Sequence, residues 1–348
     1  MHPTLATLFL MSLGLGTTLT FMSSHWLLAW MGLEISTLAI LPMMAQNHHP
    51  RAVEATIKYF LVQATAASML LFLTTLNALM TGSWLIMPLS TPLIMTLMIL
   101  TLALKMGLAP LHYWLPEVLQ GLDLTTGLIL STWQKLAPFI LMMQMTYNTD
   151  MWLPTALGLA STLAGGWAGL NQTQLRKILA YSSIAHLGWM IIIVQHSPKL
   201  AFLALIIYIF STAAAFLMFN MMIVTKINAL ALTWSKTPTL TATTLLVFLS
   251  LGGLPPLTGF LPKWAILQEL VTQELPLTAT ILALTALLSL YFYLRLCYTM
   301  ALTIAPNTNN ALTPWRLKSQ QTMLPLSIMT TTSLTLLPLT PAILAFIY

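Results

Sequence analysis

The stretch KMGLAPLHYWLPEVLQGLDLTTGLILSTWQKLAP, residues 105–138, places two lysines and a histidine inside segments that otherwise read as membrane-spanning. An ionisable side chain at bilayer depth costs about 2.5 to 3.5 kcal/mol on insertion scales, so it marks a functional site by default. The stretch also contains Pro110, which interrupts a helix because proline lacks an N–H donor and clashes with the preceding turn. We therefore expect a broken transmembrane helix with buried cations beside the break.

The composition of the whole chain is typical of an integral membrane protein. Of its 348 residues, 58% are hydrophobic and 6% are charged, against roughly 25% charged residues in soluble domains. The single cysteine, Cys297, cannot form an intrachain disulfide, and no cysteine set exists for an iron–sulfur cluster. The net charge of +6 is spread over residues that flank apolar segments, which argues against a nucleic-acid partner.

Windows of about 20 apolar residues predict about eleven membrane spans. They lie near residues 3–22, 25–45, 58–80, 90–120 (interrupted), 125–146, 151–171, 177–195, 200–225, 240–271 (interrupted), 277–303 and 323–346. No segment between spans is long enough for a soluble domain. The sequence therefore predicts an all-α polytopic membrane protein with a single transmembrane domain over residues 1–348.

The charges of the loops predict the orientation of the chain. If an odd number of spans puts the termini on opposite sides, one face carries most of the basic loop residues, and the other carries essentially Lys199 with Asp150 and Glu274. The basic set is Arg51, Lys58, Arg176, Lys177, Lys226, Lys236, Arg316 and Lys318. The positive-inside rule then places the N-terminus on the positive side.

The two interrupted spans resemble one another. Residues 107–119 read GLAPLHYWLPEVL and residues 253–265 read GLPPLTGFLPKWA, with six identical positions in thirteen. Pro110 and Pro256 fall at equivalent places, so both helices should break there. Such a pair of interrupted segments indicates a transporter built from two inverted repeats, although chance matching in a low-complexity sequence is the alternative.

Six ionisable residues within the spans are candidates for a proton relay, because proton transfer needs a series of groups that gain and lose protons. They are Glu34, Lys105, Lys135, Lys263, His112 and His186. The alternatives are that lysines near span ends extend to the membrane surface, that the histidines only join helices by hydrogen bonds, and that Glu34 is a satisfied structural partner. Arg295 is expected to have a structural role.

Other polar residues carry weaker predictions. Glu117 and Asp123 flank the end of the first broken span, where they either collect protons or are solvated loop acids. The histidines near loops, His25, His48 and His49, lack other residues that would complete a metal site. No metal site is therefore predicted.

Three stretches carry a resemblance to a known family. ALKMGLAPLHYWLPEV (103–118), RKILAYSSIAHLGWM (176–190) and LSLGGLPPLTGFLPKW (249–264) resemble the signature segments of antiporter-like membrane subunits. The likeness is to the subunit 2 family of mitochondrial NADH:ubiquinone oxidoreductase, respiratory complex I, and covers essentially the full chain. The Thr-, Leu- and Met-rich composition is similar to that of animal mitochondrially encoded proteins. The resemblance implies two inverted five-helix repeats, without the three N-terminal helices of bacterial relatives.

The resemblance also implies roles for individual residues. Glu34 and Lys105 match the acid–lysine pair of the family, Lys135 matches the central lysine, and Lys263 matches the lysine of the second broken helix. His112 and His186 fall in matching motif positions, with less defined roles.

The implied function is proton translocation from the mitochondrial matrix to the intermembrane space, as part of a proton-translocating enzyme complex. Other subunits would drive it by electron transfer, and would handle NADH, FMN, iron–sulfur clusters and ubiquinone, so this chain would bind no cofactor. The chain would lie in the mitochondrial inner membrane with its N-terminus in the matrix and its C-terminus in the intermembrane space. Expected partners are a neighbouring antiporter-like subunit, small core subunits, accessory subunits and phospholipids such as cardiolipin. A cation/proton antiporter subunit and a membrane scaffold with merely paired charges are the alternatives.

Overall fold

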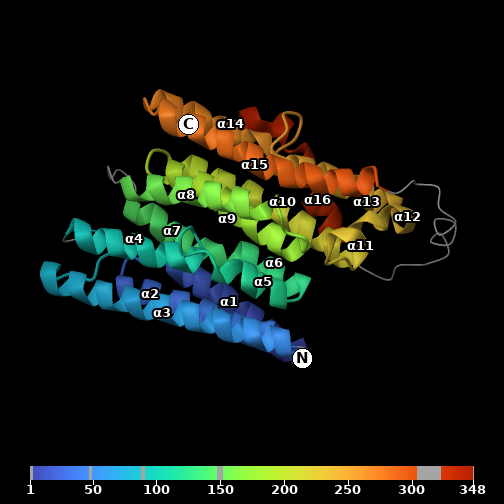
Figure 1. Cartoon of the computed structure of the whole chain (residues 1–348). Helices are drawn as coiled ribbons and strands as arrows, with labels where there is room; N and C mark the ends of the chain where they lie inside the picture. The colour runs from blue at the N-terminus through green and yellow to red at the C-terminus, as the bar shows by residue number, and fades with distance from the viewer. Residues whose placement is uncertain (1–2, 47–48, 88–90, 147–151, 304–322, 348) are drawn as a thin grey trace. The chain divides into compact units, whose positions relative to one another are not determined.

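The computed structural model describes residues 3–46, 49–87, 91–146, 152–303 and 323–347, and helices dominate these ranges (Figure 1). The described residues contain no β-strand, only two isolated bridges, which join His25 to Leu85 and Gln174 to Lys226. The chain divides into two compact units, residues 1–158 and 159–348. Each unit is described by itself.

The first unit contains seven α-helices and one 3₁₀ turn within its described residues. They are α1 (Pro3–Met22), α2 (Trp26–Met44), α3 (Pro50–Thr81), α4 (Pro92–Met106), α5 (Trp114–Gly121), α6 (Leu124–Thr132), the 3₁₀ turn η1 (Trp133–Lys135) and α7 (Leu136–Thr146). Short polar caps start several of them: His25 accepts the N–H of Leu27 at 3.4 Å, and Thr91 accepts that of Ile94 at 3.4 Å. The histidines His25 and His49 are thus helix caps.

Helix α8 (Trp152–Gly169) runs from the first unit into the second. The second unit continues with α9 (Leu175–Val194), α10 (Pro198–Met222), α11 (Ile227–Ala231), α12 (Thr233–Lys236), α13 (Pro238–Gly252), α14 (Phe260–Thr272), α15 (Pro276–Ala301), α16 (Leu324–Thr335), the 3₁₀ turn η4 (Leu337–Leu339) and α17 (Thr340–Ile347). Prolines stand in the first turn of α10, α13 and α15, where a missing N–H costs no hydrogen bond. The short helices α11 and α12 were not predicted from the sequence.

Six described helices are long and apolar enough to cross a membrane: α1, α2, α3, α9, α10 and α15. Helices α4 and α13 are shorter and also apolar. These findings confirm an all-helical membrane fold. The count of eleven spans, the inverted repeats, the single domain and the orientation of the termini stay predictions, and Arg316, Lys318, Asp150 and His48 lie outside the described residues.

The two predicted helix breaks are present, but glycine rather than proline ends the first half of each. Helix α4 ends at Gly107 with φ 81° and α13 at Gly253 with φ 78°, left-handed conformations that glycine adopts without a Cβ clash. The N–H of Leu108 returns to the carbonyl of Ala103, and the N–H of Leu254 returns to that of Leu249. Pro110 and Pro256 lie three residues further on, inside the non-helical connections.

Two further interruptions were not predicted. The span near 125–146 contains the 3₁₀ turn η1, and the last span contains η4. Pro138 lacks the N–H that would bond the carbonyl of Gln134, and Pro338 lacks the one that would bond Leu334, so an unbroken α-helix is disfavoured at both places. Lys135 therefore lies in a 3₁₀ turn rather than in the middle of a regular helix.

Glycines allow close approach of helices within each unit. A Cβ on Gly16 of α1 would lie 2.8 Å from the carbonyl oxygen of Gly32 in α2, and one on Gly32 would lie 2.7 Å from that of Gly16. In the second unit, a Cβ on Gly165 of α8 would lie 2.8 Å from the carbonyl oxygen of Tyr181 in α9. Small residues at such crossings are typical of helix packing in membranes.

Candidate functional site

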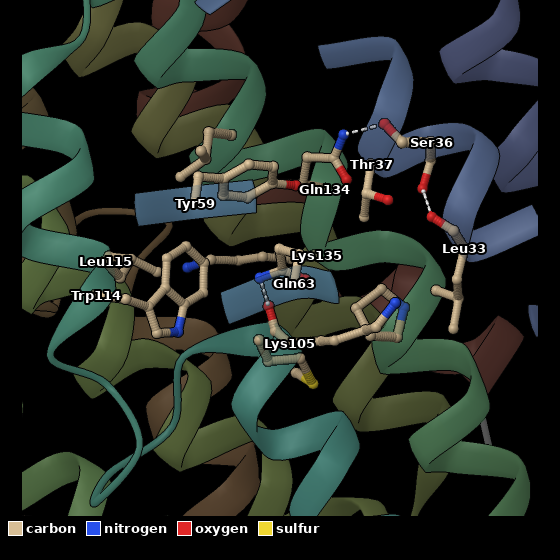
Figure 2. Close-up of a pocket in the computed structure, with 13 residues that line it drawn as sticks. Leu33, Ser36, Thr37, Tyr59, Gln63, Lys105, Trp114, Leu115, Gln134 and Lys135 are labelled. Carbon is tan, nitrogen blue, oxygen red and sulfur yellow. Dashed lines mark hydrogen bonds between the residues drawn. The ribbon is translucent and has the colours of Figure 1, made fainter. Parts of the chain in front are cut away.

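The first unit contains a small cavity that brings Lys105 and Lys135 together. Its space for the centre of a water molecule is about 10 Å³, roughly enough for one water. The lining comes from all helices of the unit between α2 and α7 (Figure 2) and comprises Leu33, Ser36, Thr37, Tyr59, Gln63, Lys105, Met106, Trp114, Leu115, Leu130, Gln134, Lys135 and Pro138. We call it the first cavity.

Lys105 occupies the last turn of α4, directly before the first break. Its side chain is buried, and its Nζ has no hydrogen-bond partner among the described residues. The backbone carbonyl of Lys105 accepts a hydrogen bond from Nε2 of Gln63 at 3.4 Å (Figure 2). Burying an ammonium group without a hydrogen-bond partner costs free energy. We therefore expect the Nζ of Lys105 to bind a water molecule or an acidic side chain.

Lys135 reaches the same cavity from η1 and is also buried. In Figure 2 its side chain extends in the direction of Trp114. Short 3₁₀ stretches inside a helix often mark functional hinges. The turn between α6 and α7 therefore places the second lysine at a second irregular point of the backbone.

Aromatic and amide side chains hold the walls of the first cavity. Nε1 of Trp114 donates to the carbonyl of Leu104 at 3.0 Å, and its ring lies 5.8 Å from that of Tyr59. Nε2 of Gln134 donates to the carbonyl of Ser36 at 2.8 Å (Figure 2). The walls thus join α2 to η1, and α3 to both halves of the broken helix.

Glu34 lies on α2 beside this cavity but does not line it. Its side chain is half-buried, and its Oε2 accepts the hydroxyl of Thr37 at 3.4 Å. The carboxylate lies within electrostatic range of Lys105, yet no ion pair within 4.0 Å joins the two described side chains. The structure therefore shows the acid and the lysine as near neighbours out of direct contact.

His112 is buried in the connection between α4 and α5 and stacks on Tyr113 with ring centroids 4.4 Å apart. It does not line the first cavity. Of the three candidates from the opening stretch, the two lysines share a cavity, and the histidine stands in the backbone break outside it.

The second unit encloses an analogous cavity that brings His186 and Lys263 together. Its space for water centres is about 20 Å³, enough for one or two waters. Helices α9, α10, α13 and α14, with Gly259 just before α14, provide the lining, which comprises His186, Trp189, Met190, Ala204, Ile207, Tyr208, Ser211, Ser250, Leu251, Gly259, Pro262, Lys263 and Ile266. We call it the second cavity.

Lys263 lies in the first turn of α14, directly after the second break, and its Nζ donates to the carbonyl of Gly252 at 2.8 Å. His186 projects from α9, and its ring centroid lies 5.6 Å from that of Tyr208 on α10. The lysine thus bridges the two halves of its broken helix, with a histidine and a tyrosine in the same cavity.

Arg295 and Lys58 have structural partners. Arg295 donates through Nη1 to the carbonyl of Leu170 at 2.6 Å, as expected of a structural residue. Lys58 of α3 bridges Glu54 at 2.8 Å and Glu117 of α5 at 2.9 Å. Among the described residues, no group of three or more histidine, cysteine or acidic side chains could hold a metal ion.

Sequence reasoning missed the neutral polar residues of both cavities. These are Ser36, Thr37, Tyr59, Gln63, Gln134, Tyr208, Ser211 and Ser250. Tyr59 and Gln63 are four residues apart, which puts them on one face of α3, and such polar pairs in an apolar span were the available signal. With them, each cavity combines lysine with hydroxyl, amide or imidazole groups that can pass or hold a proton.

Comparison with known proteins identifies the family of this chain. The family model described as NADH:quinone oxidoreductase/Mrp antiporter, TM, matches residues 23–289, and that described as NADH dehydrogenase subunit 2 C-terminus matches residues 290–344. The chain is 67% identical over 344 residues to NADH-ubiquinone oxidoreductase chain 2 of Carassius auratus, and 64% identical over 344 residues to that of Danio rerio. Each alignment covers 99% of both chains.

Solved structures show the same fold. A chain of respiratory complex I from Thermus thermophilus superposes with a TM-score of 0.85 at 28% identity, over 98% of this chain and 79% of that one. A chain of the Mrp complex from Dietzia sp. superposes with a TM-score of 0.83 at 15% identity, over 96% of this chain and 75% of that one. The second likeness supports the fold alone. The chain therefore belongs to the NADH-ubiquinone oxidoreductase chain 2 family, the antiporter-like membrane subunits of respiratory complex I, and is a multi-pass helical protein of the mitochondrial inner membrane.

Proposed function

We propose that this chain moves protons from the mitochondrial matrix to the intermembrane space through its two cavities, driven by NADH-to-ubiquinone electron transfer in other subunits of the complex. The observation that carries the proposal is the first cavity, where the buried Lys105 and Lys135 line one water-sized space. Lysines with access to water inside a membrane protein can exchange protons without leaving their helices.

The first cavity supplies the loading step of this proposal. A proton on Lys105 or Lys135 is destabilised by burial, and a nearby carboxylate offsets that cost. Glu34, which stands within electrostatic range of Lys105 but not in contact, is the group that would approach and recede. Moving one charge against about 180 mV costs roughly 4 kcal/mol, which is of the order that making or breaking a buried ion pair can supply.

The second cavity supplies the later proton-transfer step of this proposal. His186, Tyr208 and Lys263 surround one space, and imidazole is the side chain whose proton exchanges most readily near neutral pH. His112 stays a candidate beside the first break, although it does not line the first cavity. Translocation through these stations makes the chain part of the proton-translocating activity of the enzyme complex.

The proposal also covers the orientation of the chain in the membrane and its partners. We infer that its N-terminus faces the matrix and its C-terminus the intermembrane space, because the basic loop residues predict that orientation. Its partners would be other membrane subunits of the complex, including a neighbouring antiporter-like subunit, with accessory subunits and phospholipids such as cardiolipin on its lipid-facing surface. It would bind no cofactor itself.

The decisive experiment replaces Lys135 with alanine and measures the rates of proton translocation and of NADH oxidation by the assembled complex in sealed vesicles. We expect proton translocation to fall by about tenfold or more, since each 1.4 kcal/mol added to a transfer barrier slows it about tenfold. Lys236→Ala, at an exposed lysine at the end of α12, is the matched control and should leave translocation unchanged.

Other outcomes would point to other functions. Normal translocation in an assembled Lys135→Ala complex would support a scaffold whose charges are only structural. Translocation that requires sodium would favour a cation/proton antiporter.

A further inference from the structure

Helix α16 contacts the second break through three buried polar groups. Ser250 at the end of α13, Thr258 in the connection and Ser333 in α16 are each 2% exposed or less. Ser250 and Thr258 both donate hydroxyl hydrogen bonds to the backbone carbonyl of Ser333, the former at 2.9 Å. The second break thus donates two hydroxyls to one carbonyl of a helix that lies 75 or more residues further along the chain.

The carbonyl of Ser333 can accept these bonds because of where α16 ends. The helix stops at Thr335 and gives way to the 3₁₀ turn at Leu337–Leu339. The last carbonyls of a helix have no intrahelical N–H donor and need other partners. The hydroxyls of Ser250 and Thr258 provide them.

Ser250 also fixes the beginning of the second half-helix. Its Oγ accepts the N–H of Gly259 at 3.2 Å. A Cβ on Gly259 would lie 1.8 Å from the carbonyl oxygen of Ser250, so only glycine permits this approach. Ser250 therefore ties α16 and the start of α14 to the end of α13.

This junction lies directly beside the lysine of the second cavity. Ser250 and Gly259 line that cavity, and Gly252, whose carbonyl accepts the Nζ of Lys263, follows Ser250 by two residues. We propose that Ser250 and Thr258 are positioning residues that fasten the second break to α16 and thereby hold the acceptor of Lys263 in place. The inference rests on the proposed function, because it gives the terminal helix a part in the second proton-transfer site.

Two further observations favour this role. The antiporter family model ends at residue 289, and α16 lies in the segment matched by the subunit 2 C-terminal model. The first break is fastened differently. Leu104 stands three residues before Gly107, as Ser250 stands before Gly253, and its carbonyl accepts the indole N–H of Trp114 in the second half of the same broken helix. Gln63 of α3 donates to the carbonyl of Lys105, so among the described residues the first break is held by α3 and the second by α16.

The test replaces Thr258 with valine, which keeps the shape of the side chain and removes the donor. In the assembled complex we expect the coupled proton-translocation rate to fall about two- to tenfold, the equivalent of one hydrogen bond of ordinary strength, with a changed pH profile. Thr258→Ser should restore both. The matched control is Thr330→Val, since the hydroxyl of that α16 residue donates only within its own helix, to Ser327.

Ser250→Ala provides an independent second variant. If Thr258→Val prevents assembly, Ser250→Ala is measured in its place and should show the same loss and the same change in pH profile. The proposal is overturned if the assembled variant matches Thr330→Val in rate and pH profile. Lys263→Met separates a failure of the proposed function from a failure of this inference. Normal proton translocation in Lys263→Met would overturn the role of the second cavity. Lost translocation in Lys263→Met, together with normal translocation in Thr258→Val, would overturn only the positioning role of Ser250 and Thr258.

Discussion

The two cavities are built on the same plan but carry their charges differently. The first cavity lies between α2, α3 and the two halves of the first broken helix. The second lies between α9, α10 and the two halves of the second broken helix. In the first, the lysine precedes the break and a second lysine lines the same cavity. In the second, the lysine follows the break and shares its cavity with a histidine. The break is therefore the constant element, and single positions around it decide which proton-binding groups it presents.

The register of the two breaks makes this difference explicit. Lys263 stands ten residues after Gly253, and the residue ten after Gly107 is Glu117. Glu117 points to the surface of the first unit, where it pairs with Lys58 at 2.9 Å. Equivalent positions thus hold an ion pair at a helix surface in one unit and a candidate proton carrier in the other.

Removing the cation from each cavity gives the largest expected effect and tests whether the cavities act together. Lys105→Met and Lys263→Met should each lower proton translocation about tenfold. If the cavities form one path, the double variant should lose little more than the stronger single variant, because residues of one network are not additive. Two separate paths would instead be indicated if each single variant removed only the share of the flux that its own path carries and the two losses added in the double variant. The rate of proton translocation by the assembled complex in sealed vesicles is the measurement.

Alanine at the two glycines that end the first halves of the broken helices should separate the effect of backbone strain from the effect of displacing a lysine. Gly107→Ala and Gly253→Ala meet similar strain, about 1 to 2 kcal/mol for a left-handed residue with a Cβ. At Gly107 the new Cβ lies 2.9 Å from a leucine methyl of Leu115, whereas at Gly253 it lies 2.8 Å from Cδ and 3.0 Å from Nζ of Lys263. We expect similar losses of thermal stability and a larger loss of translocation for Gly253→Ala. Equal losses of translocation would contradict a special role of Lys263.

The surface ion pairs of the first unit should give the smallest effect. Glu117→Gln removes the bond between α5 and α3, and Glu54→Gln, the matched control, removes only the bond within α3. Both side chains are more than half exposed, so each change should lower the free energy of unfolding only slightly. Thermal denaturation of the assembled complex measures it. A loss of translocation in Glu117→Gln alone would instead indicate that this acid collects protons, the alternative left open by the sequence.

Much of the fold could be predicted because hydropathy alone marks spans. Helices α1, α2, α8, α9, α10 and α15 begin and end within about four residues of the predicted limits. The breaks were also predicted, but the residue that ends the first half was misjudged, since Gly107 and Gly253 provide the left-handed turn and proline only prevents the helix from resuming. Pro138 was a signal for the turn at Lys135 that apolar windows do not register.

The grouping of the candidate site was beyond sequence reasoning. Lys105 and Lys135 are thirty positions apart, and nothing in their spacing shows that α4 and η1 face the same space. The pairing of His186 with Lys263 likewise depends on how α9 packs against α14. Charge inside a span identifies a residue as a candidate, whereas tertiary packing decides its neighbours.

The contact between Gly16 and Gly32 limits how the acid of the first unit can move. Gly32 is two residues from Glu34, and at this point the backbones of α1 and α2 are so close that neither glycine has room for a methyl group. Sliding or turning α2 would open a void or force backbone atoms into one another, and both are costly in a packed interior. We therefore expect the proposed approach of Glu34 to Lys105 to be a change of side-chain rotamer on a fixed helix, a reorientation on the sub-microsecond timescale rather than a helix displacement.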